Sequence, residues 1–319
     1  MSNHVWDDNG HDDAPHVLVI GAMAADAKGQ PTVALMPGTS TPGIVRLSVG
    51  GVGRNIAANL AQLGVPTILI SAIGNDPIGN LILQNTAQSG VDVAHVITSE
   101  RHRSGTFISI LDQDGTSSLA IDDMAVVDAL TPALIYQNRR LFRDASMVVL
   151  DANVPPKTID TVFNLCRRYG RQVCVDPTSA ILAPRFKPYL PDITLMTPNL
   201  IEAKTIAGIA PDQEIDVQYL AMQLVSMGVE IAIITLAEKG LYYATSDENG
   251  RVLALNRDVV DLAGAGDALT AAMVFGLLND LSIGEAVRLG ISAAALTIQC
   301  QETVCPNLSL DRLYDELVI

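Results

Sequence analysis

Short, continuous apolar runs separated by helical stretches are the feature of this sequence that most constrains its fold. The first run is Val17-Leu18-Val19-Ile20, which ends at Gly21. An apolar run without polar alternation is typical of a parallel strand buried on both faces. Similar runs follow at 67–73, 146–150, 172–175, 193–196 and 231–236, with helical stretches at 56–63, 157–169 and 217–227. We therefore expect a doubly wound α/β sheet flanked by helices, with ligands at the carboxyl ends of its strands.

Two regions, about 31–49 and 104–123, contain strand patterns with no helix between them. The second includes the turn Asp112-Gln113-Asp114-Gly115, which is typical of a hairpin. We expect a small β-sheet here, acting as a lid over the strand ends and offering an apolar face for a homodimer contact. Two additional edge hairpins are the alternative interpretation. Residues 1–15 are polar and acidic, which predicts a disordered leader before a single domain over 16–319.

The overall charge excludes some classes of partner. A formal net charge of −15 argues against binding to nucleic acid or to an anionic membrane surface, because both need a concentrated positive surface. No apolar run reaches the roughly 18 to 20 residues of a membrane span, and the N-terminus does not resemble a signal peptide. We expect a cytoplasmic protein. The cysteines lack metal-binding spacing and are interpreted as reduced core thiols: Cys166, Cys174, Cys300 and Cys305.

A glycine-rich cluster near the C-terminus points to phosphate chemistry. It runs Asp261-Leu262-Ala263-Gly264-Ala265-Gly266-Asp267 and leads into an apolar helical run at 268–278. Small residues before a helix let several backbone N–H groups converge with the positive end of the helix dipole, which forms an anion site. Asp267 could accept the proton of a hydroxyl that attacks a bound phosphoryl group. A glycine-rich helix cap with Asp at the N-cap is the alternative.

A second glycine cluster, Gly50-Gly51-Val52-Gly53-Arg54-Asn55, opens a predicted helix. It does not follow the first strand, so it is a weak dinucleotide signal. The Asn55 amide could hydrogen-bond sugar hydroxyls, while the glycines let a ligand lie close to the backbone. A tight strand-to-helix turn would explain the same residues.

Together the two clusters resemble the two signatures of the PfkB, or ribokinase-like, carbohydrate kinases. The first match covers 50–74, with Gly50, Gly51, Gly53, Asn55, Ala57, Gly64 and Gly74 at the family spacing, and the second covers 261–274. The resemblance extends over essentially everything after the leader. It implies a ribokinase-like fold and a kinase that uses ATP and Mg²⁺ to phosphorylate an alcohol on a small molecule.

The resemblance also implies roles for individual residues. Asp267 would be the catalytic base, and Gly264, Ala265 and Gly266 would form the anion hole. Substrate hydroxyls would be held by Asp26, Gly51 and Asn55. The nucleotide would contact the anion-hole glycines, Asn199, Thr235 and Gly240, while Glu202 arranges Mg²⁺ through water. Asp261 is a candidate ligand of a monovalent cation such as K⁺.

The substrate pocket is less closely defined by the sequence. Asn153 and Asp176 each follow a predicted strand and fit either a substrate pocket or a loop cap. Strands of the expected lid offer Ser109, Asp122 and Asp123 as polar groups, with Phe107 and Met124 as apolar walls.

Within the family, three segments of the sequence are most similar to bacterial members that act on pseudouridine. They are 48–64, Ile121-Asp122-Asp123-Met124 and Asp151-Ala152-Asn153. This implies transfer to the 5′-hydroxyl of that nucleoside. A kinase for another ribonucleoside or sugar, and a catalytically idle nucleoside sensor, are the alternatives. Three positions depart from the family pattern: Leu262, Ala237 and Ala24.

Overall fold

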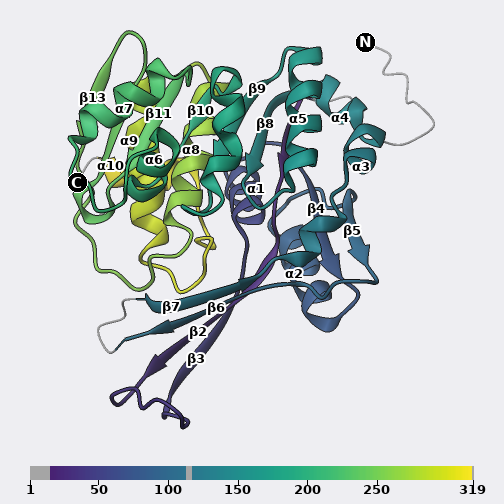
Figure 1. The fold of residues 1–319 in the computed structure, drawn as a ribbon, viewed down its shortest axis with the longest axis vertical. Coiled ribbons are helices and arrows are strands. Elements are labelled where there is room, and N and C mark those ends of the chain that lie inside the picture. Colours follow the sequence, from purple (N-terminus) through teal and green to yellow (C-terminus); the bar gives the residue numbers. More distant parts are fainter. Residues whose placement is uncertain (1–14, 113–116, 318–319) are drawn as a thin grey trace.

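The computed structural model describes residues 15–112 and 117–317. The predicted leader, apart from Pro15, and most of the predicted turn at 112–115 lie outside the described residues. Within them, the main sheet has nine strands (Figure 1). Their order is β13 (Asn249–Val252), β12 (Leu241–Ala244), β11 (Ile231–Thr235), β10 (Leu195–Met196), β9 (Gln172–Asp176), β8 (Ala145–Asp151), β1 (His16–Ile20), β4 (Thr67–Gly74) and β5 (Val96–Ser99).

The central strands of this sheet are parallel, and β12 and β13 extend it as an antiparallel hairpin. The expectation of a doubly wound α/β sheet is confirmed. Strands β5, β12 and β13 were not predicted from the sequence. These strands are four residues long, and the two in the hairpin contain Tyr, Asn, Gly and Arg, so they lack the continuous apolar runs by which the central strands were recognised.

Helices cover both faces of the main sheet because the side chains of each strand alternate between two hydrophobic clusters. In β1, Val17 and Val19 pack toward one face, and Leu18 and Ile20 toward the other. The first face is covered by α1 (Val52–Gln62), α2 (Pro77–Gln88), α8 (Ala265–Leu278) and α9 (Ile283–Thr297). The second is covered by α3 (Pro132–Gln137), α4 (Arg139–Asp144), α5 (Pro156–Tyr169), α6 (Leu200–Ala207) and α7 (Val217–Ser226). The C-terminal α10 (Leu310–Leu317) packs with α8 and α9.

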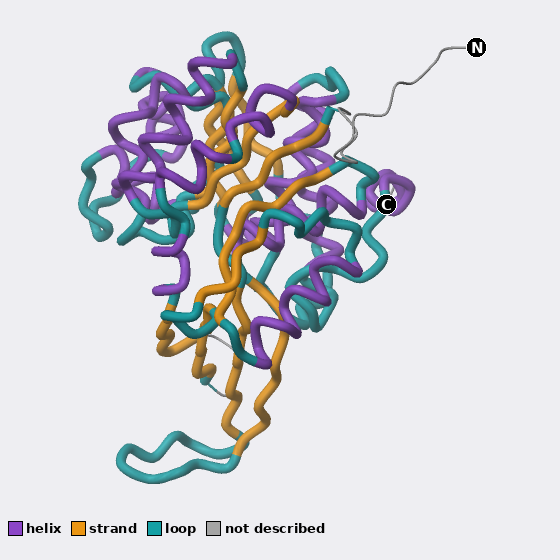
Figure 2. The backbone as a smooth tube through the Cα atoms, turned by 90° about the vertical axis from the view of Figure 1, so that its right-hand side faces the viewer, coloured by secondary structure: helices purple, strands orange, loops and turns teal. Residues whose placement is uncertain are grey.

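A second, four-stranded sheet projects from the main body as a long ribbon (Figures 1 and 2). We call it the small sheet, and its order is β3 (Gly43–Gly50), β2 (Ala24–Pro31), β6 (Gly105–Leu111) and β7 (Ser117–Asp123). The predicted boundary of its first half, 31–49, was wrong. The strand β2 begins earlier, and residues 32–42 form no strand. Three alanines and a glycine in β2 weaken the alternation by which a strand is recognised.

The two faces of the small sheet differ in character. Cross-strand partners lie on the same face, and the register pairs Asp26 with Ser48 and Phe107, and Phe107 with Asp122. That face is mostly polar, and it continues with Lys28, Arg46 and Ser109. The opposite face carries exposed aliphatic side chains: Val45, Leu47, Ile108, Ile110, Leu119 and Ile121. We refer to these six residues as the aliphatic face.

The helix α8 is the most deeply buried helix near the predicted anion site, with Asp267 to Gly276 all buried. A Cβ added at Gly276 would lie 2.6 Å from the Cβ of Ala286 in α9, so the two helices pack at close range. The hydroxyl groups of Thr197 and Thr270, 2.8 Å apart, join the end of β10 to α8. These contacts fix the start of α8 relative to the sheet. Among the described residues, no helix combines the length and the apolar character needed to cross a bilayer.

Candidate active site

The predicted anion site begins at Gly264, a position that only glycine fits. Gly264 is the N-cap of α8 and has a φ of +82°, a backbone conformation that glycine adopts without a steric penalty. A Cβ at this position would overlap the backbone carbonyl of Thr303, whereas Gly266 faces open space. No side chain caps this helix, so Asp267 is not its N-cap. Asp267 lies in the first turn, which leaves the backbone N–H groups at the helix start available to a ligand.

Asp267 is a buried carboxylate with an elevated pKa. Its side chain is 9% exposed, and its Oδ2 accepts a hydrogen bond of 2.8 Å from the Asn55 side-chain amide. Burial raises the pKa of Asp267 to about 7, and the nearby carboxylates of Asp151 and Asp26 contribute to the same direction. The hydrogen bond from Asn55 and the charge of Arg54 oppose this rise in pKa. A carboxylate with a pKa near neutrality is suited to take up and release a proton.

The Asn55 amide is oriented by two donors. Its Oδ1 accepts hydrogen bonds from Arg54 Nη1 at 3.0 Å and from Thr303 Oγ1 at 3.1 Å, which directs its Nδ2 toward Asp267. Arg54 is itself buried and donates to the Val49 carbonyl, and its desolvation lowers the pKa of its guanidinium to about 10.

Arg54 and Thr303 were not among the site residues predicted from the sequence. Arg54 is part of the glycine cluster at 50–55, where its charge is the signal that could have identified it. Thr303 lies in a region without a recognisable pattern, and its proximity to Asn55 follows only from the tertiary structure.

Two further carboxylates lie at the carboxyl ends of neighbouring strands, where Asp151 of β8 is in register with Asp176 of β9. Asp151 accepts backbone N–H groups from Ala22 at 2.7 Å, Gly53 at 2.9 Å and Asn153 at 2.9 Å. Burial raises the pKa of both carboxyl groups, and for Asp176 the charges of Asp267 and Glu202 add to this effect. Several acidic groups therefore converge on the start of α8. For Asn153, the backbone N–H contact to Asp151 fits the loop-cap interpretation.

Asn199 and Glu202 form a capping box at the start of α6. The Asn199 side chain accepts the backbone N–H groups of Ile201 and Glu202, and the Glu202 carboxylate accepts the Asn199 backbone N–H at 2.9 Å. Burial raises the pKa of Glu202. Among the described residues, no three His, Cys, Asp or Glu side chains lie close enough together to bind a metal ion directly.

Thr235 and Gly240 belong to one turn at the end of β11. The backbone N–H of Thr235 donates to the Pro198 carbonyl at 2.9 Å, which places Thr235 beside Asn199 in a parallel bridge. The backbone N–H of Leu236 donates to the Gly240 carbonyl at 2.8 Å. Ala237, where the family usually has glycine, has a φ of +52°. That conformation disfavours any residue with a Cβ, so this turn is slightly strained.

The polar face of the small sheet meets the site through Asp26 and Lys28. Burial raises the pKa of Asp26 to about 6. The Asp26 carboxylate lies against Gly50, so that a Cβ at position 50 would overlap the carboxylate. Lys28 Nζ forms an ion pair of 2.6 Å with Asp261 Oδ2. Gly51, with a φ of +96°, lies against Ala22 and leaves no room for a side chain. Ala24 lies on the same face as Asp26, and Leu262 is largely exposed.

Of the side chains expected in the substrate pocket from β6 and β7, Phe107 lies on the polar face with Asp26, whereas Asp123 does not. Asp123 pairs with Thr106 on the opposite face and accepts the backbone N–H of Ala125 at 3.2 Å. A shift of one residue along a strand reverses the face of a side chain, so adjacent aspartates cannot be distinguished without the register. Asp122, the partner of Phe107, lies on the polar face.

The site therefore brings together an open helix N-terminus, a buried carboxylate with a pKa near neutrality, and a polar sheet surface beside it. These elements can hold an anionic group, deprotonate a hydroxyl and bind a polar small molecule. Residues from the two glycine clusters, more than two hundred positions apart, meet at the hydrogen bond between Asn55 and Asp267.

Comparison with known proteins agrees with this geometry. The chain is 31% identical to the pseudouridine kinase of Escherichia coli K12, over 92% of this chain and 94% of that protein. The structure resembles Arabidopsis thaliana ribokinase in complex with ribose and ATP, with a TM-score of 0.84 and 23% identity over 96% of this chain and 99% of that one. It also resembles an E. coli protein assigned as ribokinase II, in complex with ATP and Mg²⁺, with a TM-score of 0.82 and 16% identity over 95% and 99%.

A model of the pfkB family of carbohydrate kinases matches residues 14–309, which is most of the chain. Since the fold is that of ribokinases as well, the chain belongs to the pfkB family, whose members are phosphotransferases that act on an alcohol group.

Proposed function

We propose that this protein is an ATP-dependent kinase that phosphorylates the 5′-hydroxyl of pseudouridine, and that it works in the cytoplasm, where ATP is available. The observation that carries the proposal is the position of Asp267. Its buried carboxylate lies in the first turn of α8, beside the open N-terminus of that helix and within hydrogen-bonding distance of Asn55. The identity to a pseudouridine kinase supports the choice of substrate.

In the proposed mechanism, Asp267 accepts the proton of the substrate hydroxyl as the oxygen attacks phosphorus. Backbone N–H groups at 264–266 hold the negative charge that develops on the transferred group. Asn55 keeps the Asp267 carboxylate aimed at the hydroxyl. The small sheet would serve as a lid that excludes water while it binds the sugar through Asp26.

The polar side chains at the start of α6 fit a nucleotide with a bound Mg²⁺ that contacts the protein through water molecules. Glu202 and Asn199 would orient the hydrated ion, with Thr235 and Gly240 contacting the nucleotide. A bound Mg²⁺ would neutralise part of the phosphate charge. Without this, the acidic side chains at the site would repel the nucleotide. Asp261 is already neutralised by Lys28, so we propose ATP and Mg²⁺ as cofactors and assign no role to K⁺.

The polar face of the small sheet supplies a means of recognising the base. Pseudouridine differs from uridine in a C-glycosidic bond that leaves an additional ring N–H. Asp122 and Ser109, on the same face as Phe107, are acceptors that could meet this group. In the complex with uridine, an acceptor placed for this N–H would be buried without a partner, at a cost of about 1 to 3 kcal/mol. This corresponds to roughly a tenfold to hundredfold preference for pseudouridine over uridine.

Replacing the proposed base should separate binding from chemistry. Asp267→Asn keeps the shape of the side chain and its contact with Asn55 but removes the basicity. We expect phosphoryl transfer to slow by roughly 10² to 10⁴ or more while nucleotide affinity changes little. Single-turnover kinetics and calorimetric titration of an ATP analogue measure the two effects.

The pH profile provides the control. Because the base acts when ionised and the pKa of Asp267 is about 7, kcat/KM of the parent should fall as the pH drops below 7. The variant should lose this dependence. Turnover within a few-fold of the parent would exclude Asp267 as the base.

Glu202 and Glu285 provide a matched pair for testing the magnesium role. Both complete capping boxes, Glu202 buried at the start of α6 and Glu285 at the start of α9 with Ser282. Glu202→Gln should raise the Mg²⁺ concentration needed for half-maximal rate more than it raises the KM for nucleoside, whereas Glu285→Gln should change neither. An unchanged Mg²⁺ titration would mean that Glu202 is only a helix cap.

A substrate panel tests the acceptor. We expect kcat/KM for pseudouridine to exceed that for uridine by roughly tenfold or more, with adenosine, ribose and fructose lower still. ATP-dependent formation of each phosphate at equal concentration gives the comparison. If uridine or a free sugar reacts at least as efficiently, the pseudouridine proposal fails and the kinase proposal remains. Binding of nucleosides without turnover of any would favour a sensor.

We also propose that the aliphatic face of the small sheet forms a homodimer contact, because six exposed aliphatic side chains gather on one sheet face and contiguous apolar patches often mark protein–protein interfaces. The double variant Leu47→Lys and Ile121→Lys should sediment as a monomer while the parent sediments as a dimer. Ile181→Lys is the control, since Ile181 is exposed but lies outside the small sheet. A monomeric parent at micromolar concentration would refute the contact.

A further inference from the structure

The loop that follows α9 contacts both glycine clusters. Thr303 Oγ1 lies 2.6 Å from the Val49 carbonyl oxygen and 3.1 Å from Asn55 Oδ1, so its one hydroxyl hydrogen is shared between two acceptors. The Thr303 carbonyl packs against Gly264 so closely that a Cβ there would overlap it. Through this one residue, the loop holds the amide that contacts Asp267 and also the turn that begins α8.

Two cysteines flank Thr303. Cys300 and Cys305 are free thiols, and their sulfur atoms lie 2.7 Å apart. A disulfide bond is about 2.05 Å long, so only a small adjustment separates this contact from a covalent bond. Cys300 is half-buried and can be approached from solvent, whereas Cys305 is 2% exposed. The other two cysteines, Cys166 and Cys174, are buried and belong to other parts of the core.

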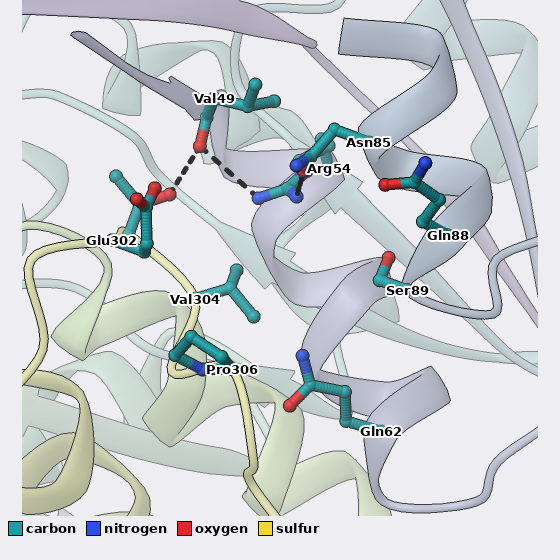
Figure 3. Close-up of a pocket in the computed structure, with 10 residues that line it drawn as sticks. Val49, Arg54, Gln62, Asn85, Gln88, Ser89, Glu302, Val304 and Pro306 are labelled. Atoms are coloured by element: carbon teal, nitrogen blue, oxygen red, sulfur yellow. Dashed lines mark hydrogen bonds between the residues drawn. The ribbon is translucent and has the colours of Figure 1, made fainter.

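The loop between the cysteines is supported on one side only. Figure 3 shows Glu302, Val304 and Pro306 along one wall of a cavity of about 330 Å³, with Gln88 and Ser89 of α2 and its C-cap across from them. A loop that borders a cavity lacks packing on that side. Thr303 and Val304 are nevertheless buried, and the Thr303 hydroxyl joins the loop to Val49 and Asn55.

We propose that Cys300 and Cys305 are a modification site at which a reversible disulfide clamps the 301–304 loop and holds Thr303 against Gly264 and Asn55. The thiols already meet in the arrangement that places Thr303 correctly. The bond therefore fixes this arrangement and does not displace it.

The oxidant is a low-molecular-weight disulfide such as oxidised glutathione. The Cys300 thiolate attacks one of its sulfurs, which forms a mixed disulfide and releases one thiol. The Cys305 thiolate then attacks the Cys300 sulfur, closes the protein disulfide and releases the second thiol. Two protein thiols are thus oxidised while one disulfide is reduced to two thiols, and excess thiol reverses the exchange.

The surroundings affect the rate of this exchange. Burial, together with the adjacent Cys305, raises the pKa of Cys300 to about 12, so the first step should quicken as the pH rises. Arg312 lies beside the pair, with its Nη1 3.8 Å from Cys305 Sγ, and its charge opposes the rise in the pKa of Cys300.

The test uses the full-length protein after incubation with oxidised or reduced glutathione. Oxidation should remove the mass of two hydrogen atoms and two titratable thiols, and peptide mapping should link Cys300 to Cys305. The midpoint of thermal unfolding should rise by about 2 to 5 °C. Hydrogen exchange should slow in peptides that cover 298–306 and the start of α8.

Cys300→Ala and Cys305→Ala should each abolish these changes, while Cys166→Ala should retain them. Four free thiols after oxidation, or a stable glutathione adduct on Cys300, would overturn the proposal. An unchanged or lowered unfolding midpoint in a protein with the disulfide formed would refute the clamp. These measurements need no substrate, so they remain valid whether or not the proposed kinase activity is found.

Discussion

The buried carboxylate of Asp151 is the contact on which the site depends. It is 1% exposed and accepts backbone N–H groups from the residues after β1, at the start of α1 and after β8. Each of these groups would otherwise be a buried donor without a partner, at a cost of about 1 to 3 kcal/mol. Because α1 carries Asn55, the same carboxylate that ties two strand ends to a helix also sets the position of the amide that meets Asp267.

The electrostatics of the site follow from this rigidity. Burial raises the pKa values of Asp26, Asp151, Asp176 and Asp267, and repulsion from neighbouring carboxylates adds to this rise for Asp176 and Asp267. The cations close to them are Arg54, whose hydrogen bonds are made to protein groups, and Lys28, which is paired with Asp261. A polyanionic ligand would meet net negative charge from side chains and favourable N–H groups from the backbone. This balance of charge supports the proposal that the nucleotide binds together with Mg²⁺.

The fold could be predicted because its main signals are local. Buried parallel strands appear as continuous apolar runs, and both glycine clusters occur where the backbone needs positive φ or close approach, as at Gly51 and Gly264. What could not be predicted depends on register and on tertiary contact. The choice between Asp122 and Asp123 required the pairing of β6 with β7. Thr303 and the meeting of Cys300 with Cys305 required the path of a loop that carries no pattern.

The contacts that assemble the site join distant parts of the chain. Asn55 meets Asp267 across 212 positions, Lys28 meets Asp261 across 233, and Thr303 meets Val49 across 254. During synthesis, the N-terminal half of the site must wait for nearly the whole chain to emerge from the ribosome. Until then Asn55, Lys28 and Val49 lack their partners, and a truncated chain that ends before α9 would still lack Thr303.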